Sequence, residues 1–174
     1  MTMLKARAFV EIDLEQREAE KTRLELLHTQ IDEQPLKEKR RLLNEFLEIV
    51  GNRDDKLQRR IQACNILGGR RKELGINGSR AVTSKLRNIL EREFFIFRRS
   101  GLLFLNREIR LREVGPIRFC FLEVLLLSLL RIDYGNMFLF VEQVASKVEN
   151  PQSKAKLTKL LADEKRRLKK NYEK

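Results

Sequence analysis

The feature that most constrains the fold is a run of twelve mostly apolar residues from Phe119 to Leu130, which also contains Glu123. Leu122, Leu126 and Leu130 recur at the spacing of one helix face, and other apolar residues of the run nearly surround that face. A helix that is apolar on most sides is normally buried on most sides. The run therefore predicts a helix at the centre of the fold or against a second subunit.

The same run is too short to favour a membrane span. A twelve-residue helix reaches about 18 Å, whereas the hydrocarbon core of a membrane is roughly 30 Å thick. Arg118 and Arg131 flank the run, so we favour a buried helix and expect no membrane partner. A peripheral membrane protein that uses Phe119–Leu130 and the basic segment Lys165–Lys170 is the third and weakest of our functional hypotheses.

The rest of the chain also favours helices, because only three prolines and eight glycines interrupt its 174 residues. Gly68-Gly69, Gly115-Pro116 and Asn150-Pro151 are the clearest breaks between segments with helical spacing. We therefore predict a mainly α, helical protein with a small β-hairpin in the middle. Its predicted helices span 3–33, 36–50, 54–67, 79–93, 117–133, 137–149 and 152–172.

Three regions follow from these breaks. Residues 1–34 are predicted to form a long polar helix, which packs loosely along the body or pairs with a helix of a protein partner; Pro35 ends it. Residues 35–115 form a basic helical region. Residues 116–174 form a helical core or dimerisation region that ends in a basic C-terminal helix.

The positive charge of the chain is concentrated rather than spread evenly. The net charge is +12, from 37 Lys and Arg against 25 Asp and Glu. Residues 51–116 alone carry 16 basic and 7 acidic side chains, which gives +9. A localised basic surface attracts phosphate backbones or anionic lipid. The alternative is a surface that is charged only for solubility.

Residues 70–112 combine a predicted helix end, a second helix and short strand-favouring runs. Leu74-Gly75-Ile76 has the form of a helix end that enters a turn. Phe95–Gly101 and Leu102–Leu105 are short runs of strand-favouring residues around a turn. The segment resembles a winged helix-turn-helix, a fold used mainly for binding DNA. The resemblance implies a recognition helix around Val82–Leu90 and a β-hairpin wing after it.

The segment departs from the winged helix-turn-helix pattern at two places. One residue more than usual separates Ile76 from Val82, and Phe94 stands where the pattern usually has glycine. A helix that continues through 94–114 is the competing interpretation, because leucine and arginine also suit helices.

The outer face of the predicted recognition helix is basic and polar. It lies opposite Val82, Leu86 and Ile89 on a 3.6-residue period. Phosphate contacts need such donors, and arginine or asparagine can also read base edges. Three basic residues precede the turn, and the resemblance implies two arginines at the tip of the wing. The candidate nucleic-acid-binding residues are Arg70, Arg71, Lys72, Arg80, Thr83, Ser84, Arg87, Asn88, Arg98 and Arg99. The alternative is a solvated helix face on a structural subdomain.

Patterns that would indicate catalysis or a cofactor are weak. His28 is the one histidine, and it has no neighbouring cysteine pair, so we predict no metal site. The segment Gly68–Lys72 lacks the spacing of a phosphate loop. Ser153-Lys154 has no supporting motif around it. We therefore predict no enzyme and no cofactor.

The two cysteines, Cys64 and Cys120, lie far apart within apolar helical patterns. We expect free buried thiols, and a reducing, cytoplasmic compartment.

These patterns lead to one favoured function and one rival. We expect a basic nucleic-acid-binding protein, a regulator that contacts DNA rather than RNA through a central winged helix-turn-helix. A homodimer through 117–149 would allow two half-sites to be bound. The rival is a helical scaffold or adaptor subunit of a larger assembly, in which the N-terminal helix and the Phe-rich region 94–140 bind proteins.

Overall fold

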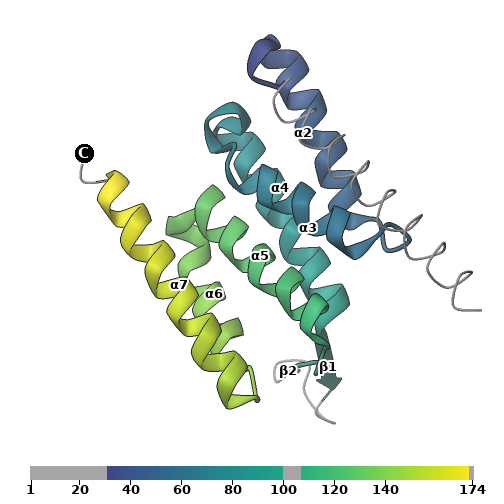
Figure 1. Cartoon of the computed structure of the whole chain (residues 1–174), viewed down its shortest axis with the longest axis vertical. Coiled ribbons are helices and arrows are strands. Elements are labelled where there is room, and N and C mark those ends of the chain that lie inside the picture. The colour runs from purple at the N-terminus through teal and green to yellow at the C-terminus, as the bar shows by residue number, and fades with distance from the viewer. Residues whose placement is uncertain (1–30, 100–106, 173–174) are drawn as a thin grey trace, which may run out of the picture.

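The structure is a computed structural model that describes residues 31–99 and 107–172; the N-terminal helix predicted for 1–34, with His28, lies almost entirely outside them. The described chain is mainly α, as predicted (Figure 1). Its elements are α2 (Leu36–Gly51), α3 (Leu57–Gly68), α4 (Arg71–Phe94), β1 (Phe95–Arg99), β2 (Arg107–Leu111), α5 (Pro116–Ile132), α6 (Tyr134–Ser146) and α7 (Pro151–Tyr172).

Helix α5 lies at the centre of the fold, with α3 and α4 on one side and α6 and α7 on the other (Figure 1). Leu122, Leu126 and Leu130 are buried within the chain, which confirms the burial predicted from the apolar run. The hydrophobic core includes residues from both sides of Gly115. The predicted regions 35–115 and 116–174 therefore share one core along α5.

A close approach between α3 and α5 is built on small residues. A Cβ placed on Gly68 would lie 2.9 Å from Ser128 Oγ and 3.3 Å from Ser128 Cα. The Ser128 hydroxyl donates a hydrogen bond to the Cys64 carbonyl oxygen (3.0 Å), and the Cys64 Sγ lies 3.4 Å from the same hydroxyl. Cys64 is a free buried thiol, as expected.

Cys120, by contrast, is exposed, so the expectation of two buried thiols is wrong for this residue. The first turns of α5 have an open side, where Ile117 is also exposed, while Phe121 one position later is buried. The sequence pattern predicts burial along the whole apolar run. In the structure, the N-terminal end of α5 is covered on one face only.

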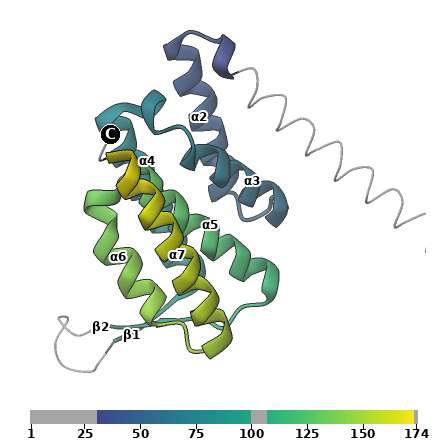
Figure 2. The same cartoon turned by 60° about the vertical axis from the view of Figure 1, so that its left-hand side comes forward.

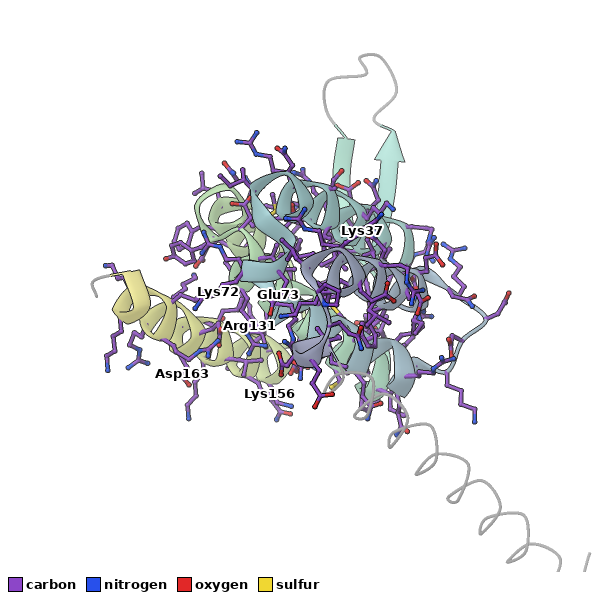
Figure 3. All side chains as sticks on the ribbon, turned by 90° about the horizontal axis from the view of Figure 1, so that it is seen from above. Lys37, Lys72, Glu73, Arg131, Lys156 and Asp163 are labelled. Carbon is purple, nitrogen blue, oxygen red and sulfur yellow. The ribbon has the colours of Figure 1, made fainter. Side chains whose placement is uncertain are left out.

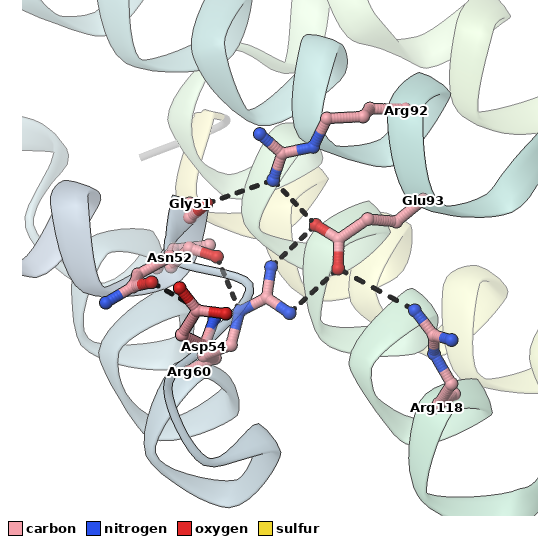
Figure 4. Close-up of polar contacts among 8 residues, drawn as sticks. Gly51, Asn52, Asp54, Arg60, Arg92, Glu93 and Arg118 are labelled. Carbon is pink, nitrogen blue, oxygen red and sulfur yellow. Dashed lines mark hydrogen bonds and ion pairs between the residues drawn. The ribbon is translucent and has the colours of Figure 1, made fainter.

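Helix α2 covers α3 and α4 with the face predicted for it. Leu43, Phe46, Leu47 and Val50 are buried there. Leu36, the first residue of α2, is 51% exposed although it is apolar. The packing of α2 brings its C-terminal carbonyls to the side chains of Arg60 and Arg92 (Figure 4).

Two predicted helix boundaries are wrong. Asp54 and Asp55 lie in a turn before α3 rather than in its first turn, since Asn52 Oδ1 accepts a hydrogen bond from the backbone N–H of Asp54 (3.1 Å).

Gly135 and Asn136 lie inside α6 instead of separating two helices. The break falls at Asp133, whose carboxylate accepts hydrogen bonds from the Asn136 side chain and so fixes the start of α6. By contrast, Asn150 does cap α7, accepting bonds from two backbone N–H groups.

The stretch around Gly75 was predicted to be a turn, but it is helical on both sides of that residue. Gly75 has φ 70° and ψ −177°, a conformation that glycine adopts without the steric cost of a Cβ. The helix predicted to begin at Ser79 begins earlier in the chain. Ser79 lies within α4 and is buried.

Strand β1 follows α4 directly and pairs antiparallel with β2, with Phe95 opposite Leu111 and Arg99 opposite Arg107. The two strands extend from the base of the helical body (Figure 2). The return strand expected at Leu102–Leu105 lies outside the described residues. Of the helices described, none is long and apolar enough to cross a membrane.

Candidate nucleic-acid interface

Helix α4 separates an apolar face from a polar one, as its spacing predicted. Val82, Leu86 and Ile89 are buried, and α4 packs against α2 and α5. On the outer side, four of the predicted site residues are exposed: Arg80, Ser84, Arg87 and Asn88. These four side chains, which come from little more than two turns, form the centre of the candidate interface.

Three of the four exposed side chains have no partner among the residues that the structure describes. Within residues 31–99 and 107–172, the side chains of Arg80, Ser84 and Asn88 make no hydrogen bond or ion pair. Arg87 is positioned by two contacts. Its Nε lies 3.3 Å from Glu91 Oε1, and its guanidinium carbon lies 4.1 Å from the centre of the Phe140 ring on α6. The face therefore offers donors that remain available to a ligand.

Thr83 does not belong to this face, so its assignment as a candidate was wrong. It is 2% exposed, and its hydroxyl donates to the carbonyl oxygens of Ser79 (2.9 Å) and Arg80 (3.1 Å). Thr83 is buried together with Val82 and Leu86 on the side of α4 that packs into the protein. Threonine commonly satisfies its hydroxyl in this way inside a helix.

Lys85 is exposed and was missed as a site residue. It lies beside Ser84 and lines a shallow groove between α2 and α4, together with Asn88 and Arg92. The signal was present in the sequence, because Lys85 stands three residues before Asn88 and so shares its side of the helix. The interface is thus more basic than predicted. We refer to Arg80, Ser84, Lys85, Arg87 and Asn88 as the outer face of α4.

Arg70 is buried and cannot present its charge to a ligand, which corrects its assignment. Its Nη1 pairs with Asp32 and lies 3.2 Å from Glu73 Oε1. Burial acts to lower the pKa of Arg70, but the hydrogen bonds to the two carboxylates outweigh it and raise the pKa. This cation joins the chain before α2 to the start of α4.

Arg71 and Lys72 are exposed, and the structure brings them to Arg80. The three cations line a cavity of about 430 Å³ between the start of α4 and the junction of α5 with α6. Figure 3 shows Lys72 at this end of the molecule, beside Glu73. Arg98 and Arg99 have their backbones in β1, but their side chains lie outside what the structure describes.

The order α3, α4, β1, β2 places a helix, a longer helix and two paired strands in succession along the chain. At Leu74-Gly75 a helical segment does end, because the backbone is non-helical at Gly75. The segment that ends there is the short turn from Arg71 to Leu74 and not α3, which already ends at Gly68. The extra helical turn from Arg71 to Leu74 therefore separates the two helices.

Comparisons with protein-family models, with curated proteins and with solved structures found no match.

Part of the charge of the basic C-terminal helix is paired within the chain, whereas Lys169 and Lys170 are exposed. Lys165 forms an ion pair with Glu142 on α6, and its Nζ lies 4.5 Å from the centre of the Phe138 ring. Burial lowers the pKa of Lys165. Arg166 and Arg167 pair with Asp163 and Glu164 on their own helix. In the part of the chain that is described, no cluster of three or more metal-ligating side chains occurs.

Proposed function

We propose that this chain is a non-enzymatic nucleic-acid-binding protein that contacts duplex DNA with the outer face of α4. One observation carries the proposal. Arg80, Lys85 and Arg87 place three exposed cations on two turns of one helix, with the polar side chains of Ser84 and Asn88 between them. Glu91 pairs with Arg87 and Glu48 lines the groove beside Lys85, so these two carboxylates offset part of this charge.

The physical basis is the dense negative charge of duplex DNA, about one charge per 1.7 Å of helix axis. Each lysine or arginine that neutralises a phosphate releases a condensed counterion, which makes binding favourable and dependent on salt. Hydroxyl and amide groups such as those of Ser84 and Asn88 add directional hydrogen bonds to phosphates or base edges. The outer face of α4 holds both kinds of group.

The strands that follow α4 supply a second basic element to the proposal. The sequence of β1 ends in Arg98 and Arg99, and that of β2 includes Arg107 and Arg110. Because the strands extend from the helical body, a duplex bound along α4 would also be within reach of this hairpin (Figure 2). We propose that it acts as the wing of a winged helix-turn-helix.

Fluorescence anisotropy with a labelled 20-base-pair duplex tests the proposal. The wild-type protein is titrated at low and at moderate salt, alongside the double variant Lys85→Gln/Arg87→Gln. If both cations contact phosphates, each removal weakens binding by about tenfold near 0.1 M monovalent salt. The matched control is Lys159→Gln/Lys169→Gln, which removes the same charge from exposed positions on α7.

The expected result is salt-dependent binding that the α4 variant weakens far more than the α7 control. Two results would overturn the proposal: no binding at low salt, or equal weakening by both double variants. The second result would mean that the net charge of the protein, rather than the outer face of α4, attracts the DNA.

The rival function, a scaffold or adaptor, has less support. Helix α5 is already covered within the chain, so in a homodimer or a protein complex formed through 117–149 the contact would fall mainly on α6. Leu139 on α6 is 72% exposed. Ile117 at the start of α5 is 57% exposed. Exposed apolar side chains that stand apart from one another are common on protein surfaces. Five polar and basic side chains gathered on one helix face are the more specific feature.

A further inference from the structure

The cavity at the start of α4 brings together residues that lie far apart in the sequence. One wall is formed by α4, from Arg71 to Arg80, and the other by the junction of α5 and α6. Ile132, Asp133 and Asn136 contribute the second wall. At about 430 Å³, the cavity is larger than a phosphate group and is open to solvent on one side.

The backbone of α4 turns at this cavity. Its conformation is non-helical at Gly75, and the helix then continues from Ile76 to Phe94. Gly75 has no side chain that could cap this second segment, and Gly75, Ile76 and Ser79 all line the cavity. The N-terminus of a helix favours an anion, because its first N–H groups and its dipole both present positive charge.

Ser79 provides an independent indication of a ligand. It is only 7% exposed and lines the cavity, yet its hydroxyl makes no hydrogen bond with any residue that the structure describes. Its carbonyl oxygen, by contrast, accepts a bond from Thr83. The hydroxyl keeps its hydrogen-bonding capacity toward the cavity, and a ligand oxygen there would take the place of solvent as its partner.

The charges around the cavity favour an anion. Arg71, Lys72 and Arg80 contribute three positive charges, and Asp133 contributes one negative charge. Both oxygens of Asp133 accept hydrogen bonds from Asn136 Nδ2, at 3.2 and 3.0 Å. The Asp133 carboxylate is therefore oriented by its own helix, and the sum of the four charges is positive.

We propose that this cavity binds one phosphate group of a nucleic-acid backbone, and that the bound phosphate fixes where the outer face of α4 lies along the duplex. The inference rests on the proposed DNA-binding function. Lys72 and Arg80 neutralise the phosphate, while the Ser79 hydroxyl and the N-terminal turn of the helix donate to its oxygens. Ile76, which is 76% exposed at the rim, would lie against the adjacent sugar.

The test uses two probes, inorganic phosphate and the 20-base-pair duplex. In amide NMR spectra of the full chain, phosphate should shift the signals of residues 76–80, and Lys72→Gln should abolish these shifts. In anisotropy titrations, Lys72→Gln should reduce the salt slope by about one. Ser79→Ala should weaken duplex binding by about fivefold without changing the slope, because it removes a neutral donor.

The matched control is Lys85→Gln, which removes a charge from the same helix outside the cavity. It should leave the response to inorganic phosphate unchanged while weakening the binding of DNA. The native amide spectrum of each variant shows that it is folded.

Two outcomes would overturn the inference. If phosphate shifts residues 76–80 but neither cavity variant alters DNA binding, the site takes a free phosphate ligand and not the backbone. If neither probe responds to Lys72→Gln or Ser79→Ala while Lys85→Gln still weakens DNA binding, the cavity is no phosphate site and the proposed function stands. If the wild-type protein does not bind the duplex at all, the proposed DNA-binding function is wrong, whether or not inorganic phosphate shifts the amide signals.

Discussion

Arg60 on α3 and Glu93 on α4 form a buried ion pair with two hydrogen bonds, Nη1 to Oε1 at 2.8 Å and Nη2 to Oε2 at 2.6 Å (Figure 4). Their side chains are 4% and 3% exposed. Arg92 donates to the same carboxylate at 3.0 Å, and Arg118 on α5 lies 3.8 Å from it. Arg60 and Arg92 also bind the last carbonyls of α2, so this cluster joins α2, α3, α4 and α5.

Replacement of Glu93 should destabilise the protein strongly. Glu93→Gln removes the charge that compensates Arg60, and a buried ion without its partner costs about 3–5 kcal/mol. The matched control is Glu91→Gln on the same helix, which breaks a largely exposed pair with Arg87 and should cost less than about 1 kcal/mol. Urea unfolding of the two variants measures the difference. Equal losses of stability would mean that the buried pair contributes no more than the surface pair.

The same carboxylate should make stability depend on pH. Burial acts to raise the pKa of Glu93, but hydrogen bonds from Arg60 and Arg92 outweigh it and hold the pKa below the usual value of 4.5. A carboxylate with a lowered pKa in the folded state stabilises the protein above the unfolded pKa, and this contribution is lost as the pH falls through the folded value. The stability difference between wild type and Glu93→Gln should therefore shrink below about pH 4.5. A constant difference from pH 7 to pH 3 would contradict this account.

Gly68 should not tolerate a side chain. Gly68→Ala would place a Cβ 2.9 Å from Ser128 Oγ and 3.3 Å from Ser128 Cα, so α3 and α5 would have to separate, at a cost of about 1–3 kcal/mol. Gly69→Ala is the control, since Gly69 has φ −88° and its nearest contact would be 3.6 Å. Thermal unfolding of both variants measures the effect. If Gly69→Ala lowers the melting temperature as much as Gly68→Ala, the close approach of the helices is not the cause.

The two thiols should differ sharply in reactivity. Burial raises the pKa of Cys64 to about 12, although the hydrogen bond with Ser128 acts in the opposite direction. Cys64 is therefore almost wholly protonated at pH 8, and the thiolate is the nucleophile. Cys120 is exposed. A thiol reagent at pH 8 should modify one cysteine of the native protein rapidly and the second only after unfolding. The rapid phase should disappear in Cys120→Ser. If it disappears in Cys64→Ser instead, Cys64 is the reactive thiol and the prediction is wrong.

Local signals in the sequence predicted most of the helical fold. The apolar run located α5 in the core because a helix without a polar face has no other stable place. Gly69, Pro116 and Asn150 mark helix ends through backbone preferences that act within a few residues. The start of α6 was misplaced because Gly135 can occupy the first turn of a helix, and Asp133 fixes that turn through a side-chain contact.

The candidate site was predictable only in part, because exposure depends on which elements pack together. The helical period placed Arg80, Ser84, Arg87 and Asn88 correctly on the outer side of α4. It could not show that Thr83 is buried in the folded chain. Nor could it show that Arg70 is held by Asp32, which lies 38 residues earlier. The cavity beside Arg80 also needs residues from the junction of α5 and α6, and no local pattern connects these segments.

The salt dependence of duplex binding by wild type, Arg80→Ala and Arg87→Ala tests the central claim most directly. The slope of log Kobs against log salt concentration counts the phosphates that the protein neutralises. If α4 contacts the DNA backbone, each variant should bind more weakly and its slope should fall by about one. Both variants should remain folded because neither side chain is buried, although Arg87→Ala also loses the contacts with Glu91 and Phe140. Wild-type affinity and wild-type slope in both folded variants would contradict the assignment of α4 as the DNA-binding element.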